Sequence, residues 1–369
     1  MKKHQKHTNL TKRENGNFAP NEIALVGTKC ATIHEIVQKI SKSLQNNYKT
    51  AYFDASHKFD KKPPLIDNYT FNKNGFFEET LQKSDNPYNL KITFNPYDLV
   101  FINGNHFPAS QQILVLDAEK EASVKKRLEQ LNNIQFIITT DENVALFDFL
   151  VAAYPAINNL KKYHIKEMEK ITLHIKNLIE QQVPRVNGLI LIGGKSTRMG
   201  TDKSNIIYHN KPQKDFLFDL LKDSFGQKNT YFSVRNKQQL DVENAIADTF
   251  LNLGPFGGIC SAFQKNPNVA WLSIATDLPF VDANVINSLL KHRNPSKIAT
   301  AFKGKSKNFP EPLITIWEPK AYPILLQYLA QGYSCPRKVL INNDVEIVEI
   351  DDKFIQNINT KEELDHLQF

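Results

Sequence analysis

Residues 190–203, "ILIGGKSTRMGTDK", join an apolar run to two glycines and a group of cations. Gly193 and Gly194 lack a Cβ, so an anion can approach the main-chain N–H groups of this turn closely. Arg198 offers a planar guanidinium to phosphate oxygens, and Lys203 adds a point charge. These residue types in this order indicate a triphosphate site. The alternative is a polar turn whose cations are simply solvated.

An acid follows a second apolar run in the same half of the chain. Asp277 comes just after residues 270–275, "AWLSIA", and Pro279 then prevents the strand from continuing. A carboxylate at the carboxyl end of a strand faces the ligand crevice, where it can hold a Mg²⁺ ion that bridges phosphates. Taken alone, Asp277 could equally cap a helix.

Two further stretches carry polar residues that suit a binding site. "IADTFLNLGPFGGI" supplies Asp248 and a second glycine turn at residues 254–258. "QNINTKEEL" supplies Asn357 and Asn359, and then a Thr and a Glu at capping-box spacing. We interpret Thr360 as a helix cap, which leaves the two asparagines available for binding.

In order and spacing, these stretches resemble one family, the molybdenum cofactor guanylyltransferases, which attach GMP to molybdopterin. The family pattern is present here at residues 191–203, 254–258, 277–279 and 357–360, within the segment 186–369. The wider nucleotidyltransferase superfamily commonly has Ala-Ala-Gly at the first turn. The Gly-Gly pair of this chain is more similar to the guanylyl branch.

The resemblance implies a set of site residues. Catalytic roles fall to Arg198, Lys203 and Asp277, with Mg²⁺ bound by Asp277. Nucleotide and substrate contacts fall to Leu191, Ile192, Gly193, Gly194, Lys203, Ser233, Asp248, Asp277, Asn357 and Asn359. Two positions depart from the family: Ile192 replaces the usual alanine, which adds bulk beside the expected base pocket, and Ser233 stands where an asparagine is frequent.

The reaction implied by this resemblance is Mg²⁺-dependent transfer of GMP from GTP to molybdopterin, with release of pyrophosphate. The acceptor's phosphate oxygen is already anionic at neutral pH, so the site needs to align two anions and neutralise them rather than supply a base. Two alternatives stay open. One is a nucleotidyltransferase for another phosphorylated acceptor, such as a sugar phosphate, and the other is a non-catalytic nucleotide-binding regulatory protein. Contacts with other cofactor-biosynthesis proteins are a further expectation.

Composition limits the class of protein. A chain of 369 residues with 41% hydrophobic residues suits two globular domains, and no apolar run is long enough to span a bilayer. Three scattered cysteines predict a reduced, cytoplasmic protein without disulfides. Most of the net charge of +7 comes from residues 1–20, which we expect to be a disordered basic tail. No nucleic-acid-binding motif is present, so we expect no nucleic-acid partner.

Unalternating apolar runs separated by helical spacing predict an α/β protein with two doubly wound, Rossmann-like domains. We expect a first domain at residues 21–153, a connecting amphipathic helix at 154–184, and a nucleotidyltransferase domain at 185–369. A helix that belongs to one of the two domains is the alternative for 154–184. The resemblance gives the latter a nucleotide-diphospho-sugar-transferase-like fold. Predicted strands are 23–26, 50–54, 99–102, 112–116, 135–139, 188–192, 230–234, 245–247, 270–275, 298–302, 312–316 and 345–349. Predicted helices, besides the connecting one, are 31–44, 119–131, 212–225, 257–265, 282–292, 318–331 and 360–367.

The turn in "IALVGTKCATIHEI" has the strand, turn and helix layout of a P-loop without the lysine that reaches phosphates. A working loop has Gly, four residues and then Gly-Lys-Ser/Thr, whereas four residues after Gly27 this chain has Thr-Ile-His at 32–34. With Asp98 and Gly104 around the next apolar run, the layout resembles the small P-loop GTP-binding protein of molybdopterin-guanine dinucleotide biosynthesis. We interpret this half as a degenerate relative that no longer hydrolyses nucleotide, with a structural or partner-binding role as the alternative.

Overall fold

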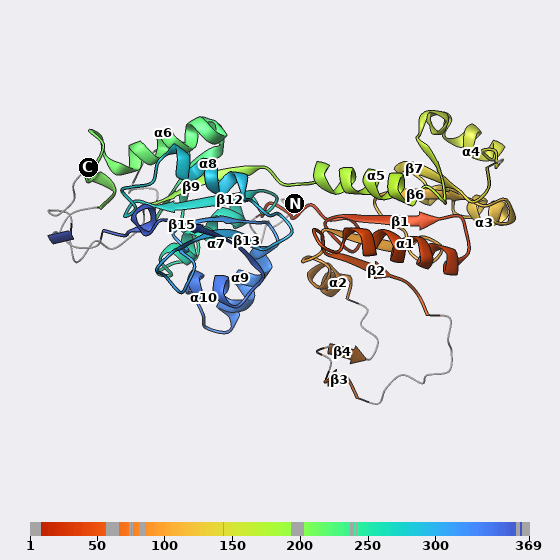
Figure 1. The fold of residues 1–369 in the computed structure, drawn as a ribbon, viewed down its shortest axis with the longest axis horizontal. Helices are drawn as coiled ribbons and strands as arrows, with labels where there is room; N and C mark the ends of the chain where they lie inside the picture. Colours follow the sequence, from red (N-terminus) through yellow and green to blue (C-terminus); the bar gives the residue numbers. More distant parts are fainter. Residues whose placement is uncertain are drawn as a thin grey trace, which may run out of the picture. The chain divides into compact units, whose positions relative to one another are not determined.

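A computed structural model describes residues 9–56, 66–73, 75, 77–80, 86–142, 144–192, 203–236, 240, 242–358 and 362–363. The chain divides into two compact units, each built on its own sheet (Figure 1). One unit runs from Asn15 to Gln182, and the other joins the chain up to Glu14 with the chain from Val183 onward. The chain therefore passes between the units twice, once between Glu14 and Asn15 and once between Gln182 and Val183.

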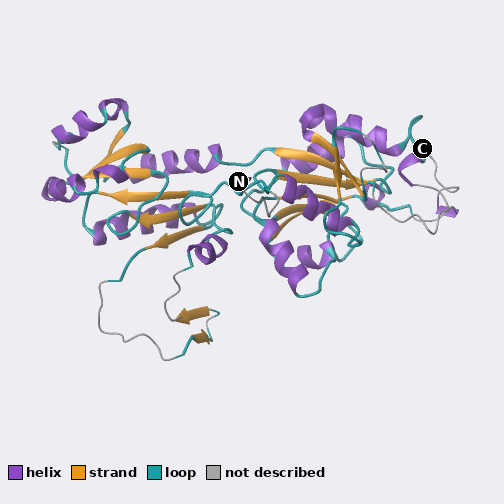
Figure 2. Ribbon diagram, turned by 180° about the vertical axis from the view of Figure 1, so that it is seen from behind, coloured by secondary structure: helices purple, strands orange, loops and turns teal. Residues whose placement is uncertain are grey.

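The first unit holds a six-stranded parallel sheet in the order β2-β5-β1-β6-β7-β8. Its central strands are buried at every residue, which explains their unalternating apolar sequences. Helices cover both faces (Figure 2). One face packs on α1 (Cys30–Leu44) and α5 (Met168–Gln181), the other on α3 (Glu121–Lys125) and α4 (Asp148–Ala153). The strands are β1 (Glu22–Val26), β2 (Thr50–Phe53), β5 (Leu99–Asn103), β6 (Gln112–Leu116), β7 (Ile134–Thr139) and β8 (Lys162–His164).

The expected connecting helix over residues 154–184 is wrong, and the alternative, a helix that belongs to one of the domains, is confirmed for α5 in the first unit. The range holds the 3-10 helix η3 (Pro155–Asn159), strand β8 and helix α5. Residues 162–164 extend the sheet by pairing with β7. The isoleucine stripe of α5 is buried in the same core as α1, so the apolar face that suggested a connector packs on the first sheet instead.

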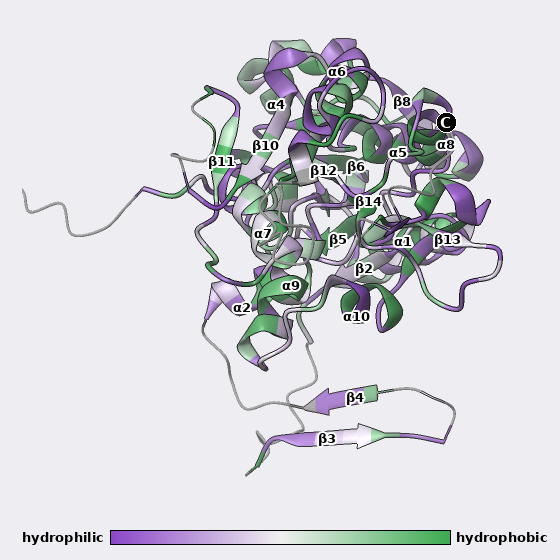
Figure 3. Ribbon diagram, turned by 90° about the vertical axis from the view of Figure 1, so that its left-hand side faces the viewer, coloured by the Kyte–Doolittle hydropathy of each residue, from purple (hydrophilic) through white to green (hydrophobic). Residues whose placement is uncertain are grey.

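Several short elements of the first unit were not predicted or are shorter than predicted. The expected helix at 119–131 is broken into η1 (Ala118–Lys120), α3 (Glu121–Lys125) and η2 (Leu128–Gln130). The unpredicted elements are α2 (Pro87–Thr93), α4 (Asp148–Ala153) and an antiparallel ribbon of β3 (Asn68–Phe71) and β4 (Phe77–Thr80). β3 is exposed throughout, and both strands carry hydrophilic colour along much of their length in Figure 3. Such runs leave little periodic signal in the sequence.

The second unit holds a seven-stranded sheet in the order β11-β10-β9-β12-β14-β13-β15. All neighbours are parallel except β14, which is antiparallel to both β12 and β13. The start of β14 therefore lies at the same edge as the carboxyl ends of β12, β13 and β15. The strands are β9 (Val186–Leu191), β10 (Thr230–Val234), β11 (Ala245–Ala247), β12 (Ala270–Ala275), β13 (Ala299–Gly304), β14 (Ile314–Trp317) and β15 (Val345–Ile350).

Helices cover both faces of the second sheet, and each helix buries one of its own sides against the sheet. One core cluster takes its helix residues from α6 (Gln213–Phe225) and α8 (Ala283–Lys291). The opposite cluster takes them from α7 (Pro255–Lys265), α9 (Ala321–Ala330) and α10 (Pro336–Ile341). The single-turn 3-10 helices are η4 (Lys203–Asn205), η5 (Gln227–Asn229) and η6 (Asp352–Ile355). The predicted fold class, two α/β units with mainly parallel sheets, is confirmed.

Two sequence expectations concern the ends of the chain and its relation to membranes. Apart from residues 362–363, the predicted helix at 360–367 lies outside the described residues. Over the part of the chain that the structure describes, none of the helices has the length and apolar character needed to cross a bilayer.

The basic tail differs from its prediction over residues 9–20, and residues 1–8 lie outside the described ranges. Arg13 donates from Nη1 to the carbonyl of Pro267 at 2.6 Å, and Glu14 N donates to Asn268 Oδ1 at 2.7 Å. Burial lowers the pKa of Arg13 to about 10, against the opposing charges of Glu14 and Glu318. Ala19 is fully buried. This segment is a packed arm of the second unit that continues into the first, so the expectation of disorder is wrong here.

Candidate functional site

Four strands of the second sheet bring predicted site residues to one edge. Leu191 ends β9 and is paired with Ser233 of β10 on one side and with Ala275 of β12 on the other. Ile192 donates from its main-chain N to the Ser233 carbonyl at 3.2 Å. The Ile192 side chain is buried in the core with α6, so the bulk it adds lies in the core rather than beside a base pocket.

A partly buried hydrogen bond joins the next two predicted residues. Ser233 Oγ donates to Asp248 Oδ1 at 3.3 Å, and Asp248 N donates to the Val234 carbonyl at 2.8 Å. Burial raises the pKa of Asp248 to about 6, against the bond from Ser233, which lowers it. The structure therefore brings Ser233 and Asp248 together at the ends of β10 and β11, where a ligand can meet a carboxylate set in a partly apolar wall.

The second glycine turn explains how α7 approaches these strand ends. Gly254 precedes the helix with φ of +58°, a conformation that favours glycine. A Cβ on Gly258 would lie 2.4 Å from Ser233 Oγ and 3.1 Å from Leu191 Cδ2. The first turn of α7 can therefore pack on the site only because Gly258 has no side chain. Sequence reasoning noted this turn but gave Gly258 no role.

Asp277 lies two residues beyond the end of β12, next to the strand that carries Leu191. Its carbonyl accepts the main-chain N–H of Ile358 at 2.9 Å, which places the Asn357 segment beside it. Tyr208 is buried nearby, and burial raises the pKa of its phenol to about 12, with the charge of Asp277 as a further cause. Asp277 thus lies in the middle of the sheet edge, held by the late segment that sequence analysis also singled out.

The carboxylate groups around Asp277 suit a divalent cation that binds together with a triphosphate. Among the described residues, no group of three or more His, Cys, Asp or Glu side chains could form a complete metal cage. Mg²⁺ does not need one, because it is commonly held by one or two carboxylates together with phosphate oxygens and waters. A second acid, Glu311, has its pKa raised by burial and, in smaller part, by the charge of Asp277. The Asp277 carboxylate therefore suits a cation that phosphate oxygens and waters also coordinate.

A cavity of about 650 Å³ lies on the other side of Asp277, where β13 and β15 end. Glu311, Arg337 and Asn357 line it, with Lys307 and Lys353 at its wall. Gly304, the last residue of β13, has no room for a Cβ, which would lie 2.0 Å from Asp352 Oδ1. Sequence reasoning missed Glu311 and Arg337. The one signal for Glu311 was an acid set between two prolines, in "FPEPLITIW".

Some predicted residues cannot be placed. Gly193, Gly194, Arg198 and Asn359 lie outside the described residues. The main chain of Lys203 begins η4, and its side chain also lies outside the described part. Their roles stay predictions.

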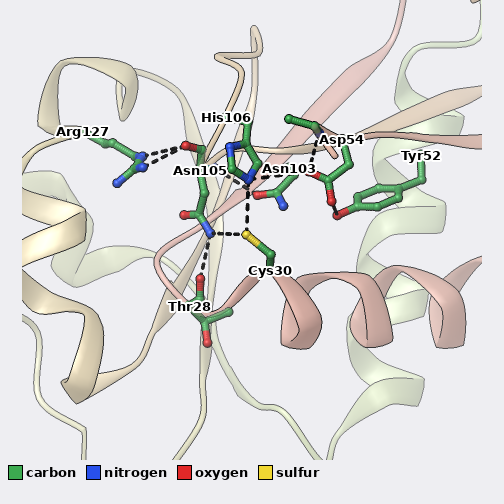
Figure 4. A network of polar contacts seen from close by, with 9 residues as sticks. Thr28, Cys30, Tyr52, Asp54, Asn103, Asn105, His106 and Arg127 are labelled. Carbon is green, nitrogen blue, oxygen red and sulfur yellow. Dashed lines mark hydrogen bonds and ion pairs between the residues drawn. The ribbon is translucent and has the colours of Figure 1, made fainter. Parts of the chain in front are cut away.

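The corresponding edge of the first sheet is filled by its own side chains (Figure 4). Cys30 Sγ, at the start of α1, lies 3.3 Å from His106 Nε2, and the same nitrogen lies 3.8 Å from Asp54 Oδ1. Asn105 donates to the Thr28 carbonyl at 2.8 Å. The figure also shows the contacts of Asn105 with Cys30 Sγ, of Tyr52 with Asp54 and of Arg127 with the Asn105 carbonyl.

The turn after β1 is also shaped unlike a phosphate cradle. α1 begins at Cys30, three residues after Gly27, so the loop is too short for the spacing between a P-loop's first glycine and its lysine. Thr28 Oγ1 donates to Asp117 Oδ2 at 2.7 Å, and Lys29 pairs with Glu119 at 2.8 Å. Acids therefore take the contacts that a phosphate would need.

Comparisons with known proteins match the second unit. Residues 188–346 match a family model described as "MobA-like NTP transferase domain". A "Molybdenum cofactor biosynthesis bifunctional protein" of Synechocystis is 34% identical over 181 residues, 48% of this chain and 52% of that relative. This chain therefore spans about half of that relative's length.

A "Probable molybdenum cofactor guanylyltransferase" of Flavobacterium johnsoniae is 26% identical over 48% of this chain and 94% of its own length. Among solved structures, "Molybdopterin-guanine dinucleotide biosynthesis protein A" from Archaeoglobus fulgidus aligns with a TM-score of 0.41 at 22% identity. That alignment covers 48% of this chain and 95% of the other.

Proposed function

Because the second unit carries a MobA-like NTP transferase domain, we propose that the protein transfers GMP from GTP to molybdopterin and releases pyrophosphate. One observation carries the proposal: Leu191, Ser233 and Asp248 meet at the sheet edge directly beside the strand that presents Asp277. The names of these relatives support molybdopterin as the acceptor. The domain proposed for this reaction is residues 185–369 together with the packed arm at residues 9–14.

The half of the edge formed by β9, β10 and β11 suits the nucleotide. Asp248 is ionised at neutral pH because its pKa of about 6 lies below 7. An ionised carboxylate can accept both N–H donors on the Watson–Crick edge of guanine, which adenine does not offer in that pattern. Ser233 holds one carboxylate oxygen in place. The main chain at Leu191 and Ile192 would lie along the nucleoside, and residues 193–194 along its phosphates.

The acceptor's phosphate oxygen attacks the α-phosphorus of GTP, the bond to the bridging oxygen breaks, and pyrophosphate leaves with the electron pair. No proton needs to be removed from the nucleophile, since it is already anionic. The chain's task is to hold two anions in line and neutralise them. Asp277 would hold the divalent ion, proposed to be Mg²⁺, which when bound offsets charge on the phosphates. Lys203 and Arg198 would supply the remaining positive charge.

Substitution of Asp277 and Lys203 tests this assignment. We expect Asp277→Ala and Lys203→Ala each to lower turnover by roughly 100-fold or more, the scale for removing a preorganised electrostatic group. The assay is pyrophosphate release from GTP in the presence of molybdopterin and Mg²⁺. Asp282→Ala is the matched control: this carboxylate accepts from Val285 N at 2.9 Å and caps α8, so its loss should cost stability and leave turnover near normal.

Normal pyrophosphate release by Asp277→Ala would overturn the proposed site. Running the same assay with all four nucleoside triphosphates, and with sugar phosphates in place of molybdopterin, tests the alternative acceptor class. Calorimetric GTP binding without turnover on any acceptor would instead indicate a regulatory nucleotide-binding protein.

For the first unit we propose a structural or partner-binding role without nucleotide hydrolysis. The supporting observation is the short turn at Gly27 and its acid-filled surroundings. Other proteins of cofactor biosynthesis are the proposed partners.

A further inference from the structure

The strand order separates the sheet edge of the second unit into two halves, with Asp277 between them. β9, β10 and β11 lie on one side of β12, and β14, β13 and β15 lie on the other. The nucleotide residues belong to the first half. The cavity of about 650 Å³ belongs to the second half, and its size suits a small-molecule ligand.

Two main-chain hydrogen bonds tie this cavity to Asp277. Ile358 N donates to the Asp277 carbonyl at 2.9 Å, and the preceding residue, Asn357, lines the cavity. Ala275 N donates to the Leu313 carbonyl at 2.9 Å, and Glu311 lies two residues before Leu313. The Oδ1 atom of Asn357 is buried without a hydrogen-bond partner among the described residues. A buried acceptor left without a donor points to a ligand that supplies one.

Glu311 is the most deeply buried charged group of the cavity. Its side chain is 8% exposed, Oε1 accepts from Leu313 N at 3.0 Å, and Oε2 lies 3.3 Å from Arg337 Nη2. The main chain around it is fixed, because Glu311 N donates to the Phe302 carbonyl and Thr315 donates to the Glu311 carbonyl. Burial raises the pKa of Glu311, with Leu313 and Arg337 acting against it.

A second buried acid in the same unit shows what a purely structural pair looks like. Glu318 is 1% exposed, and its two oxygens accept from Arg293 Nε at 2.7 Å and from Nη2 at 2.8 Å. Arg293 is itself 13% exposed. By contrast, Arg337 is 46% exposed and makes one long contact with Glu311. The Glu311 carboxylate is therefore incompletely matched by protein donors and faces a cavity.

The chemistry of the acceptor fits this arrangement. The aminopyrimidinone ring of a pterin carries two adjacent N–H donors, which a carboxylate can accept side by side. Charge-assisted pairs of this kind are shorter and stronger than neutral ones. The cations at the wall, Lys307, Arg337 and Lys353, suit phosphate oxygens at the other end of the same molecule.

We propose that Glu311 is a specificity-determining residue that binds the aminopyrimidinone edge of the acceptor's pterin ring in this cavity. The inference rests on the proposed function.

The test compares Glu311→Gln with Glu318→Gln in the full-length protein. A bidentate contact is worth about 1–3 kcal/mol of discrimination, so Glu311→Gln should raise the KM for molybdopterin by roughly 5- to 150-fold. The KM for GTP should stay unchanged, because the nucleotide half is on the other side of Asp277. Glu318→Gln should lower the midpoint of thermal unfolding. It should not raise the KM for molybdopterin relative to the KM for GTP. Equal KM values for molybdopterin in the wild type and Glu311→Gln would overturn the inference.

A second test changes the ligand and uses only the wild-type protein, so it does not depend on the folding of a variant. Free pterin should inhibit the wild-type protein competitively against molybdopterin. Pteridine-2,4-dione, in which an oxygen replaces the 2-amino group, should need at least about ten times the concentration, because one donor is lost. Equal inhibition by both compounds would also refute the role of Glu311. A wild-type protein that transfers nucleotide to no pterin would refute the proposed function instead, so the two failures are distinguishable.

Discussion

Asp248 gives the prediction in which stability and function move in opposite directions. Its carboxylate is partly buried beside Ser233 and Gly258, and burial raises its pKa to about 6 from an ordinary 3.8. The side-chain amide of an Asp248→Asn variant would keep the shape and could still accept from Ser233, but it would carry no charge. We therefore expect the substitution to stabilise the second unit at neutral and alkaline pH and to weaken GTP binding.

The sign follows from the two protonation states. A pKa that is higher in the folded state means that folding favours the neutral acid. This stabilising contribution is complete below about pH 3.8 and is lost as the pH rises through about 6. The full difference corresponds to ~3 kcal/mol. Because the group is half exposed, solvent screening reduces this to about 1 kcal/mol. Above pH 7 the variant should thus be more stable than the wild type by about 1 kcal/mol, or roughly 2–4 °C in midpoint for a domain of this size.

Urea and thermal denaturation between pH 5 and pH 8 measure the effect, with Asp219→Asn as the control. Asp219 accepts from Lys211 at 2.6 Å and from Lys222 at 3.1 Å, and these bonds lower its pKa. Because its pKa is lowered, the ionised Asp219 carboxylate stabilises the folded state at pH values above its ordinary pKa. Asp219→Asn should therefore slightly lower the free energy of unfolding at pH 8, an effect of opposite sign to that of Asp248→Asn. A difference between Asp248→Asn and wild type that does not grow with pH would refute the reasoning. So would GTP binding weakened less than about 5-fold, the lower bound for a lost bidentate contact.

Two further predictions concern the glycine turn and the first unit. Gly258→Ala should cost ~1–3 kcal/mol by overpacking and should lower turnover, because its Cβ would meet Ser233 and Leu191. Gly332→Ala is the control, because Gly332 has a φ of +83° and open space around it. It should lower the free energy of unfolding by a similar ~1–2 kcal/mol in denaturation experiments and leave turnover normal. Equal losses of turnover in Gly258→Ala and Gly332→Ala would contradict the site. The full-length protein should release no orthophosphate from GTP in a malachite-green assay, and steady orthophosphate release that persists in Asp277→Ala would contradict the degenerate turn at Gly27.

The elements that sequence analysis located correctly are those whose signal is local. β9, β10, β12 and α7 are apolar runs or periodic segments bounded by glycine or proline, so their positions follow from short-range patterns. Because the carboxyl end of a strand faces the ligand crevice, the position of Asp277 after its strand was enough to expect it at the site. Ser233 and Asp248 were expected there only because of the family resemblance.

The features that were missed depend on pairing between distant segments. The antiparallel insertion of β14 between β12 and β13 places Glu311 at the ligand edge, and no local pattern gives the direction of a buried four-residue strand. The segment 154–184 was misread for a related reason: its isoleucine spacing is truly helical, but which sheet buries that face is a tertiary choice. The packed arm was misread from charge alone, since Arg13 and its partner Pro267 lie 254 residues apart in sequence.

The two sheets, which differ in strand order and in strand direction, also differ at their carboxyl edges. In the second unit, glycines keep that edge open, because side chains at Gly258 and Gly304 would fill it. In the first unit, Cys30, Asn105 and His106 close the edge with contacts to one another. The acids Asp54 and Asp117 there put negative charge where phosphates need donors, and the main chain alone cannot overcome that repulsion. An α/β sheet alone therefore does not make a phosphate site. Building one in the first unit would require both a longer turn after Gly27 and removal of these two carboxylates.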